Sequence, residues 1–336
     1  MTTRVTQRKT LIACAVLAAA LVAAIVLMSL VGSETLPARA SLCAIFSGGT
    51  TPCGLAPDQY AILFQIRLPR ILLAAAVGAA LATAGASYQA LLRNPLAEPY
   101  LLGVSNGAAV GTMLALVFFG AFEWSRPVLA FAGALIATLT VYQLARSRTG
   151  ATPERLILAG VIVTTLLSSV IVFITTLMDA TRIRSFTFWL LGDLSGPTRS
   201  LLPLVIAIVF IGVGALTLNA RSLNLLMLGE RDAFDLGVEV GRVRIIVFVV
   251  ASLLVGSAVA ASGSVGYVGL VVPHLVRLSL GSDNRISIPA AALGGALFVI
   301  VADTFARTII APRELPVGAI TALIGAPLFI YLLKRV

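Results

Sequence analysis

Charged residues are scarce in this chain of 336 residues: only 11% are Asp, Glu, Lys or Arg, whereas 59% are hydrophobic. Soluble domains carry about 25% charged and about 45–50% apolar residues. A globule this apolar would have too little polar surface to face water, so its solvent must be lipid. The composition therefore excludes a soluble protein and indicates a polytopic membrane protein.

Metal ligands and nucleotide-binding motifs are also scarce. One histidine and three cysteines cannot complete a four-ligand metal centre without extensive help from carboxylates, so we expect no metal and no cofactor. No stretch matches the phosphate-binding G-x-x-x-x-G-K-[S/T] loop, so any ATP must be bound by another chain. The excess of 24 Lys and Arg over 14 Asp and Glu indicates membrane topology and contact with anionic lipid rather than nucleic acid.

Charge-free runs predict an all-α membrane protein with ten transmembrane helices in one domain, residues 1–336. A spanning helix needs about 20 apolar residues, and the run Ile245–Val276 is too long for a single crossing. The segment Ser262–Gly266 interrupts it, and its glycines permit a tight reversal between two helices. The remaining predicted spans are Leu11–Val31, Ile71–Leu92, Pro99–Phe122, Pro127–Ala145, Leu156–Met178, Ser200–Ala220, Ile286–Ala302 and Leu315–Leu333.

The orientation follows from the basic residues. Ten spans put both termini on one side, and a cytoplasmic location for them places most Lys and Arg residues inside, as the positive-inside rule requires. The first run is longer than the about 7–15 residues of a signal-peptide core, so we interpret it as a retained helix. This orientation leaves more arginines outside than the positive-inside rule accounts for, among them Arg67, Arg70 and Arg307.

Three stretches carry a family resemblance. In the first, residues 65–70 read Q-I-R-L-P-R and run through a small-residue helix into residues 93–107, which read R-N-P-L-A-E-P-Y-L-L-G-V-S-N-G. Residues 266–277 read G-Y-V-G-L-V-V-P-H-L-V-R, and A-D-T-F-A-R at 302–307 precedes E-L-P-V-G and G-A-P. Together they resemble the FecCD-type permeases, the membrane subunits of ABC importers for iron chelates, haem and cobalamin. The similarity covers almost the whole chain. The block that begins N-P-L-A-E-P is especially similar in cobalamin-transporting members, and siderophore and haem members carry close variants of it.

The resemblance implies a type II ABC importer permease in the bacterial inner (plasma) membrane. The permease would form a homodimer, or a heterodimer with a paralogue, around a central pathway. Two ATPase subunits would hydrolyse ATP beneath it, and a periplasmic binding protein would deliver an iron siderophore, haem or cobalamin. The permease would then perform no chemistry of its own.

The outer arginines have two interpretations. By resemblance, Arg67, Arg70 and Arg307 bind glutamates from the two lobes of the binding protein. The planar guanidinium suits this task because it pairs bidentately with carboxylate. Alternatively, these side chains snorkel to lipid phosphates, as arginines near helix ends often do.

The inner connection at residues 221–244 is similar to the coupling helices that this family inserts into the ATPase, although a solvated linker is the alternative. Asp235 departs from the family, which usually has a small hydroxyl residue there. Gly237 is a plausible helix C-cap. The residues assigned to coupling are Glu230, Asp232, Ala233, Leu236 and Gly237.

Asn94, Leu96 and Pro153 correspond to cytoplasmic gate positions in the family, and the proline is a departure from its pattern. Each of the three could equally be an ordinary turn residue.

Two rival functions are an intramembrane protease, which a glycine motif suggests, and an ion-coupled secondary transporter, which the charged residues would have to support. Gly103, Gly107 and Gly111 recur at every fourth residue, which predicts close helix packing on one face. The run from Gly103 to Gly107 also fits G-x-S-x-G, with Ser105 as nucleophile and His274, at the start of a short helix, as base of an intramembrane protease.

An ion-coupled secondary transporter is the other rival. It would need a charged residue in a proton relay, but Asp303 is expected to pair locally with Arg307.

Cys43 and Cys53 both fall in the first outer loop, in an oxidising compartment. They form either a disulfide or two free thiols, because sequence does not supply the Cβ geometry that a disulfide needs.

Overall fold

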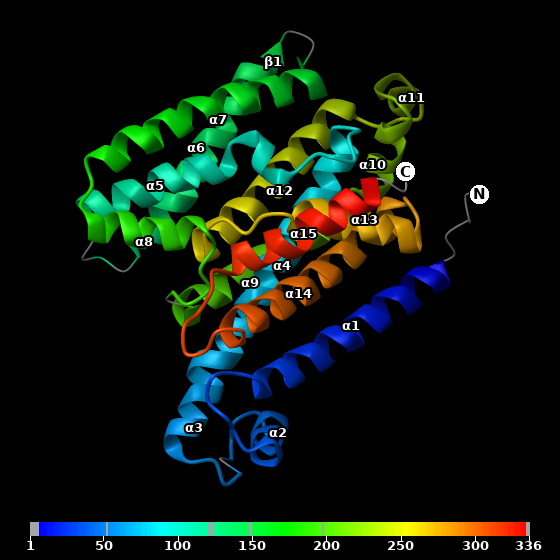
Figure 1. Cartoon of the computed structure of the whole chain (residues 1–336). Coiled ribbons are helices and arrows are strands. Elements are labelled where there is room, and N and C mark those ends of the chain that lie inside the picture. The colour runs from blue at the N-terminus through cyan, green and yellow to red at the C-terminus, as the bar shows by residue number, and fades with distance from the viewer. Residues whose placement is uncertain are drawn as a thin grey trace.

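The computed structural model describes residues 7–51, 53–119, 122, 124–147, 150–196 and 198–333. These residues are almost entirely helical, apart from one antiparallel hairpin of β1 (Arg146–Ser147) and β2 (Gly150–Ala151). The long helices lie roughly side by side in one bundle (Figure 1). The all-helical prediction is confirmed.

Within the described residues, seven helices are long and apolar enough to cross a membrane, and three shorter apolar helices accompany them. The shorter three are α5 (Val104–Phe118), α13 (Val268–Leu280) and α15 (Val317–Leu333). The long helices are α1 (Gln7–Leu30), α4 (Leu68–Leu91, continued outward by α3 and η1), α6 (Ser125–Ala145), α7 (Pro153–Thr176), α9 (Thr198–Leu218), α12 (Val240–Ser262) and α14 (Asn284–Thr308).

Short helices fill the connections. They are α2 (Ala38–Phe46), α3 (Pro57–Ala61), a π-helical segment η1 (Ile62–Arg67), a 3₁₀ turn η2 (Pro99–Leu102), α8 (Ala180–Leu190), α10 (Ala220–Leu228) and α11 (Glu230–Asp235). The start of α1 and the end of α15 lie on the same side of the bundle as α10 and α11, whereas α2, α3 and α8 lie on the opposite side (Figure 1).

Helix α4 forms the centre of the core. Its alanine-rich sequence favours a helix, and nearly all of its side chains are buried against α14, α12, α9 and α13. Gly78 and Gly85 allow this contact, because a Cβ at either position would overlap with the backbone of Gly295 or Gly269. Helix α1, by contrast, is buried over only 6% of its apolar window, as expected for a helix that faces lipid.

The predicted interruption at Ser262–Gly266 is confirmed. Helix α12 ends at Ser262, Gly263 takes a φ of 67°, and α13 begins at Val268. The prediction of one continuous span over Pro99–Phe122 is wrong, because the chain first forms η2 and then turns at Gly103 before α5 begins.

Candidate functional site

The end of the bundle that carries α2 and α3 (Figure 1) contains a buried ionic cluster. Arg70 lies in the first turn of α4, and its Nε and Nη2 donate to Oδ1 of Asp303 at 3.0 and 2.9 Å. Its Nη1 donates to Oε2 of Glu314 at 2.7 Å. Asp303 also pairs with Arg307, one turn further along α14, at 3.1 Å. Two carboxylates therefore hold two guanidinium groups in one network.

Burial explains why the charged side chains of this cluster must pair with each other. The side chain of Asp303 is only 1% exposed, and a carboxylate is tolerated at such a site only when cations pair with it. The expected local pair between Asp303 and Arg307 is confirmed. The contacts of Arg70 with Asp303 and Glu314 were not predicted, since no local spacing signals contacts over such sequence distances.

Arg67 lies beside this cluster and contacts the end of α1. Its Nη1 donates to the carbonyl oxygens of Ser29 at 3.3 Å and Leu30 at 3.4 Å, and its Nη2 donates to that of Glu34. A cation is favoured there, because the last carbonyls of a helix lack partners and carry partial negative charge. Arg307 donates to the neighbouring Val31 oxygen at 3.3 Å.

The three arginines assigned to docking are thus gathered at one end of the bundle, and each is buried and bonded within its own chain. The link nearest to solvent is the one between Arg70 and Glu314, whose side chain is 48% exposed. Docking of a binding protein at these arginines stays a prediction, and the Arg70–Glu314 pair is the accessible part of the cluster.

Ser105 and His274 are not brought together as a nucleophile and base. The Ser105 hydroxyl donates to the Ser264 hydroxyl at 3.2 Å, whereas the His274 ring packs edge-on against Phe329, with centroids 6.0 Å apart. The hydrogen bonds among the described residues include none between the two. His274 lies in the middle of α13 and not at its start, because the helix continues through Pro273.

The glycine series divides into two parts. Gly107 and Gly111 lie on α5 against α6, where an added Cβ would overlap with the carbonyl oxygen of Gly133 or Leu129. Gly103 precedes the helix with a φ of 74° and faces Val163 on α7. The prediction of a shared face for all three is therefore wrong for Gly103, which makes the left-handed turn that glycine permits.

The proposed gate residues lie in turns. The side-chain oxygen of Asn94 accepts the backbone N–H of Leu96 at 2.9 Å, a local bond typical of turns that contain asparagine. Pro153 is the first residue of α7, where its missing N–H costs nothing. These positions fit both a gate and ordinary turns.

Helix α11 is anchored on one side and exposed on the other. Glu230 forms an ion pair with Arg244 of α12, and Ala233 is fully buried. Phe234 and Leu236 are 70% and 61% exposed. Gly237 takes a φ of 83° just after the helix, as its expected C-cap role requires. Phe234 is a candidate contact residue that was not predicted, although an aromatic residue among charges is a visible signal in the sequence.

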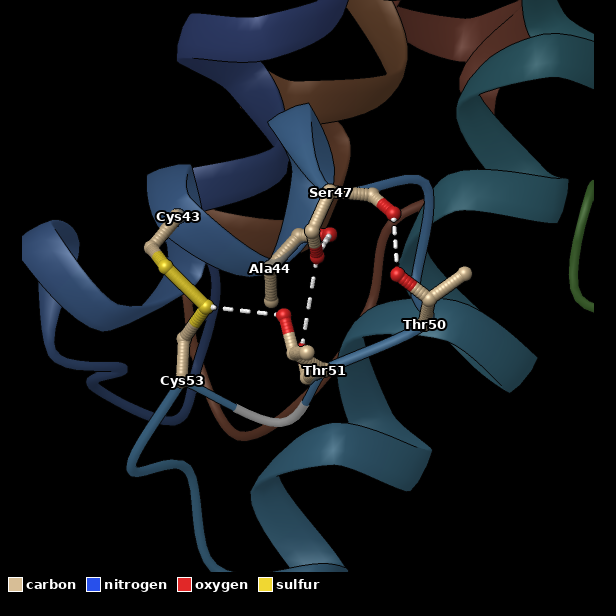
Figure 2. Close-up of a disulfide and its surroundings, with 6 residues drawn as sticks. All are labelled: Cys43, Ala44, Ser47, Thr50, Thr51 and Cys53. Carbon is tan, nitrogen blue, oxygen red and sulfur yellow. Dashed lines mark hydrogen bonds between the residues drawn. A yellow bond between two sulfur atoms is a disulfide. The ribbon is translucent and has the colours of Figure 1, made fainter.

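The connection between α1 and α4 is closed by a disulfide between Cys43 of α2 and Cys53, with Cα atoms 5.9 Å apart. Figure 2 shows the bond beside a turn in which Thr50 donates to the Ser47 carbonyl at 2.7 Å. Ser47 in turn donates to the carbonyl of Ala44 at 3.0 Å. The loop is therefore built from local side-chain contacts around the cross-link.

The comparisons with known proteins decide the family. The model of the FecCD transport family matches residues 7–335. The chain belongs to the FecCD transport family. It is thus a multi-pass membrane permease subunit of an ABC importer, which works with ATPase and binding-protein partners and is not itself catalytic. The protease interpretation is excluded on this ground.

Curated relatives of the permease include transporters of two kinds of substrate. It is 44% identical to the cobalamin import permease BtuC of Halobacterium salinarum, over 84% of this chain and 75% of the relative. It is 41% identical to the hemin transport permease HmuU of Yersinia pestis, over 82% and 83%.

A solved structure supports the type II importer fold. The permease resembles an inward-facing conformation of a metal-chelate type ABC transporter with a TM-score of 0.84 and 31% identity, over 97% of this chain and 100% of that one.

Proposed function

We propose that the permease imports a metal chelate, namely cobalamin, haem or an iron siderophore. The observation that carries this proposal is the match to the FecCD family over residues 7–335. The relatives named for cobalamin and hemin transport support it, since they are similar over most of their lengths.

Reconstituted transport tests this function. The permease would be placed in liposomes with its ATPase, and uptake of cyanocobalamin, haemin and a ferric siderophore would be measured with each candidate binding protein. We expect ATP-dependent uptake of one class, and none with an ATPase that cannot hydrolyse ATP. Uptake driven by a proton gradient without ATP would instead support a secondary transporter.

We also infer the arrangement in the membrane. The chain would form one permease domain, 1–336, that crosses the bilayer ten times with both termini in the cytoplasm of a bacterial inner membrane. Support comes from the ten apolar helices among the described residues and from the position of the start of α1 and the end of α15 beside α10 and α11 (Figure 1). Two permease subunits, alike or paralogous, would bind two ATPases. Accessibility of single cysteines in α2 and α11 to a membrane-impermeant reagent would test the sidedness.

The outer cluster is proposed as the docking site of a periplasmic binding protein. Glu314 is half-exposed and occupies the outward nitrogen of Arg70, so a partner carboxylate could take its place. Arg67 and Arg307 would contribute mainly by holding α1 and α14 in position and by adding positive charge.

The inner end is proposed to couple transport to ATP hydrolysis. The loop 221–244 contains α11, whose exposed Phe234 and Leu236 would enter a cleft of the ATPase, while the Glu230–Arg244 pair transmits the motion to α12. Asn94, Leu96 and Pro153 would close the pathway on the same side. Cross-linking across the two permease copies at Leu96 would test the gate.

A further inference from the structure

A groove between α6 and α9 runs along the outer half of the bundle. Both helices pack on α12, which contributes the small side chains of Ser257, Ala260 and Ala261 to the groove. Because these side chains are short, the larger side chains of α6 and α9 form walls on either side. Val128 and Leu204 on these walls are more than half exposed, so the groove opens towards the surroundings of the protein.

The dimensions of the groove suit a hydrocarbon chain. It extends from Leu201 to Ile208 of α9, about 10 Å at the α-helical rise. This length lies within the ~15 Å thickness of one leaflet of the membrane core. The lining is apolar except for the Ser257 hydroxyl, which donates to the Leu254 carbonyl at 2.9 Å.

A polar cavity of about 320 Å³ continues the groove outward. The two share Pro127, Leu201, Ala260 and Ala261 as lining residues. The outer cavity adds Arg126, Asp193 and Trp189. An apolar groove that leads into a cavity with one cation and one anion matches the chemistry of a lipid with a zwitterionic headgroup.

The guanidinium of Arg126 and the carboxylate of Asp193 are both available to bind a ligand. Arg126 is exposed, and the ion pairs among the described residues include neither Arg126 nor Asp193. Asp193 accepts the N–H of Ser195 at 2.7 Å and its hydroxyl at 2.5 Å, both through Oδ1. These bonds fix the carboxylate, and among the described residues they leave Oδ2 for another donor. Trp189 is an amphipathic ring of the kind enriched at membrane interfaces.

We propose that the groove and its outer cavity bind one phosphoethanolamine lipid, with an acyl chain over Ala260 and Ala261. The phosphate binds Arg126 and the ammonium binds Asp193, beside the face of Trp189. That this is the outer leaflet follows from the topology proposed above, whereas the lipid site itself does not depend on the transported substrate.

Native mass spectrometry of the delipidated, detergent-solubilised permease tests the site by titration with phosphatidylethanolamine or phosphatidylglycerol of identical acyl chains. We expect tighter binding of phosphatidylethanolamine. Arg126→Gln should weaken the binding of both lipids about fivefold, as for one well-aligned ion pair of an exposed arginine. Asp193→Asn keeps the acceptor for Ser195 and should weaken only phosphatidylethanolamine. Arg39→Gln and Asp58→Asn, exposed and outside the cavity, are the matched controls.

The acyl-chain part is tested by filling the groove. Ala261→Trp, and Val128→Trp at the exposed rim in case the first variant folds poorly, should abolish retention of both lipids. Unchanged affinities in Arg126→Gln and Asp193→Asn, or full retention in the tryptophan variants, would overturn the proposal. A changed number of permease copies in those variants would show that a protein occupies the groove, and would also overturn it.

Discussion

Arg70 and Asp303 are 233 residues apart in the chain, yet they form a buried bidentate pair with Nε–Oδ1 and Nη2–Oδ1 distances of 3.0 and 2.9 Å. The pair joins the start of α4 to the end of α14. Because Arg307 binds the same carboxylate and Arg67 binds the end of α1, three helices are fixed to each other at this end of the bundle. The same contacts that would present positive charge to a partner also hold the bundle together.

Asp303→Asn should strongly destabilise the permease. It would leave two buried guanidinium groups without their shared carboxylate, and breaking a buried pair costs about 3–5 kcal/mol. Thermal unfolding in detergent would show a lower midpoint than in Asp179→Asn, which removes an exposed ion pair with Arg182. The double variant Arg70→Met with Asp303→Leu should recover part of the loss, and a midpoint equal to wild type in Asp303→Asn would contradict this account.

Gly111→Ala should weaken the packing of α5 on α6. The added methyl would overlap with the Leu129 carbonyl oxygen, so the two backbones must move apart and lose contacts at a close-packed interface. Gly214→Ala is the control, because a Cβ there meets no atom within 4 Å. We expect a lower unfolding midpoint for the first variant and an unchanged or slightly raised one for the second. Equal unfolding midpoints in the two variants would show that the close α5–α6 contact does not limit the stability of the permease.

Local chemistry could be predicted from the sequence, whereas distant pairing could not. The interruption at Ser262–Gly266 was visible because glycine permits the turn, and the Asp303–Arg307 pair was visible because residues four apart on a helix are neighbours. Arg70 was read only as an outer arginine, because nothing local to it indicates Asp303. The turn at Gly103 was missed because a hydrophobic run does not reveal a single left-handed residue.

Asp283, the N-cap of α14, should make the stability of the permease depend on pH. It accepts from Asn224 at 2.7 Å and from Nη2 of Arg285 at 2.6 Å, and the hydrogen bonds and charge of Arg285 lower the pKa of Asp283 from 3.8 to about 2. A depressed folded-state pKa stabilises the protein fully above the unfolded value, and this stabilisation is lost as pH falls from about 4 to about 2.

Asp283→Asn tests this prediction. The variant should be less stable than wild type at neutral pH by about 1 kcal/mol, allowing for solvent screening. Unfolding midpoints measured from pH 7 downward should converge below pH ~4. A gap that stays constant with pH would show that the ionisation of Asp283 does not contribute, and the absence of a gap would mean that Asp283 acts only as the helix N-cap, a role that Asn also fills.

Phe234→Ser with Leu236→Ser should uncouple the permease from its ATPase without unfolding it. Both side chains are mostly exposed, so their replacement costs little stability in the isolated subunit, whereas an apolar contact buried in a partner contributes strongly to binding. The readouts are ATPase co-purification and ATP-driven uptake. Asp235→Ala, an exposed change on the same helix, should retain both activities, and retention in the double variant would rule out these side chains as the coupling contact.

Glu314→Gln should increase the affinity of the permease for its binding protein, if the outer cluster is the docking site. The Glu314 carboxylate occupies Nη1 of Arg70 at 2.7 Å, so it competes with any carboxylate supplied by a partner. Its neutral replacement leaves Asp303 to hold the rest of the guanidinium and binds the outward nitrogen more weakly, because an amide oxygen is a weaker acceptor than a carboxylate. Surface plasmon resonance at low and high salt should show a severalfold tighter complex with a steeper salt dependence, since one more desolvated charge pair then crosses the interface. Asp58→Asn is the matched control, because Asp58 is an exposed carboxylate on α3 at the same end of the bundle, and it should leave the affinity nearly unchanged. An affinity that is equal in Glu314→Gln and wild type would place the docking contacts away from Arg70.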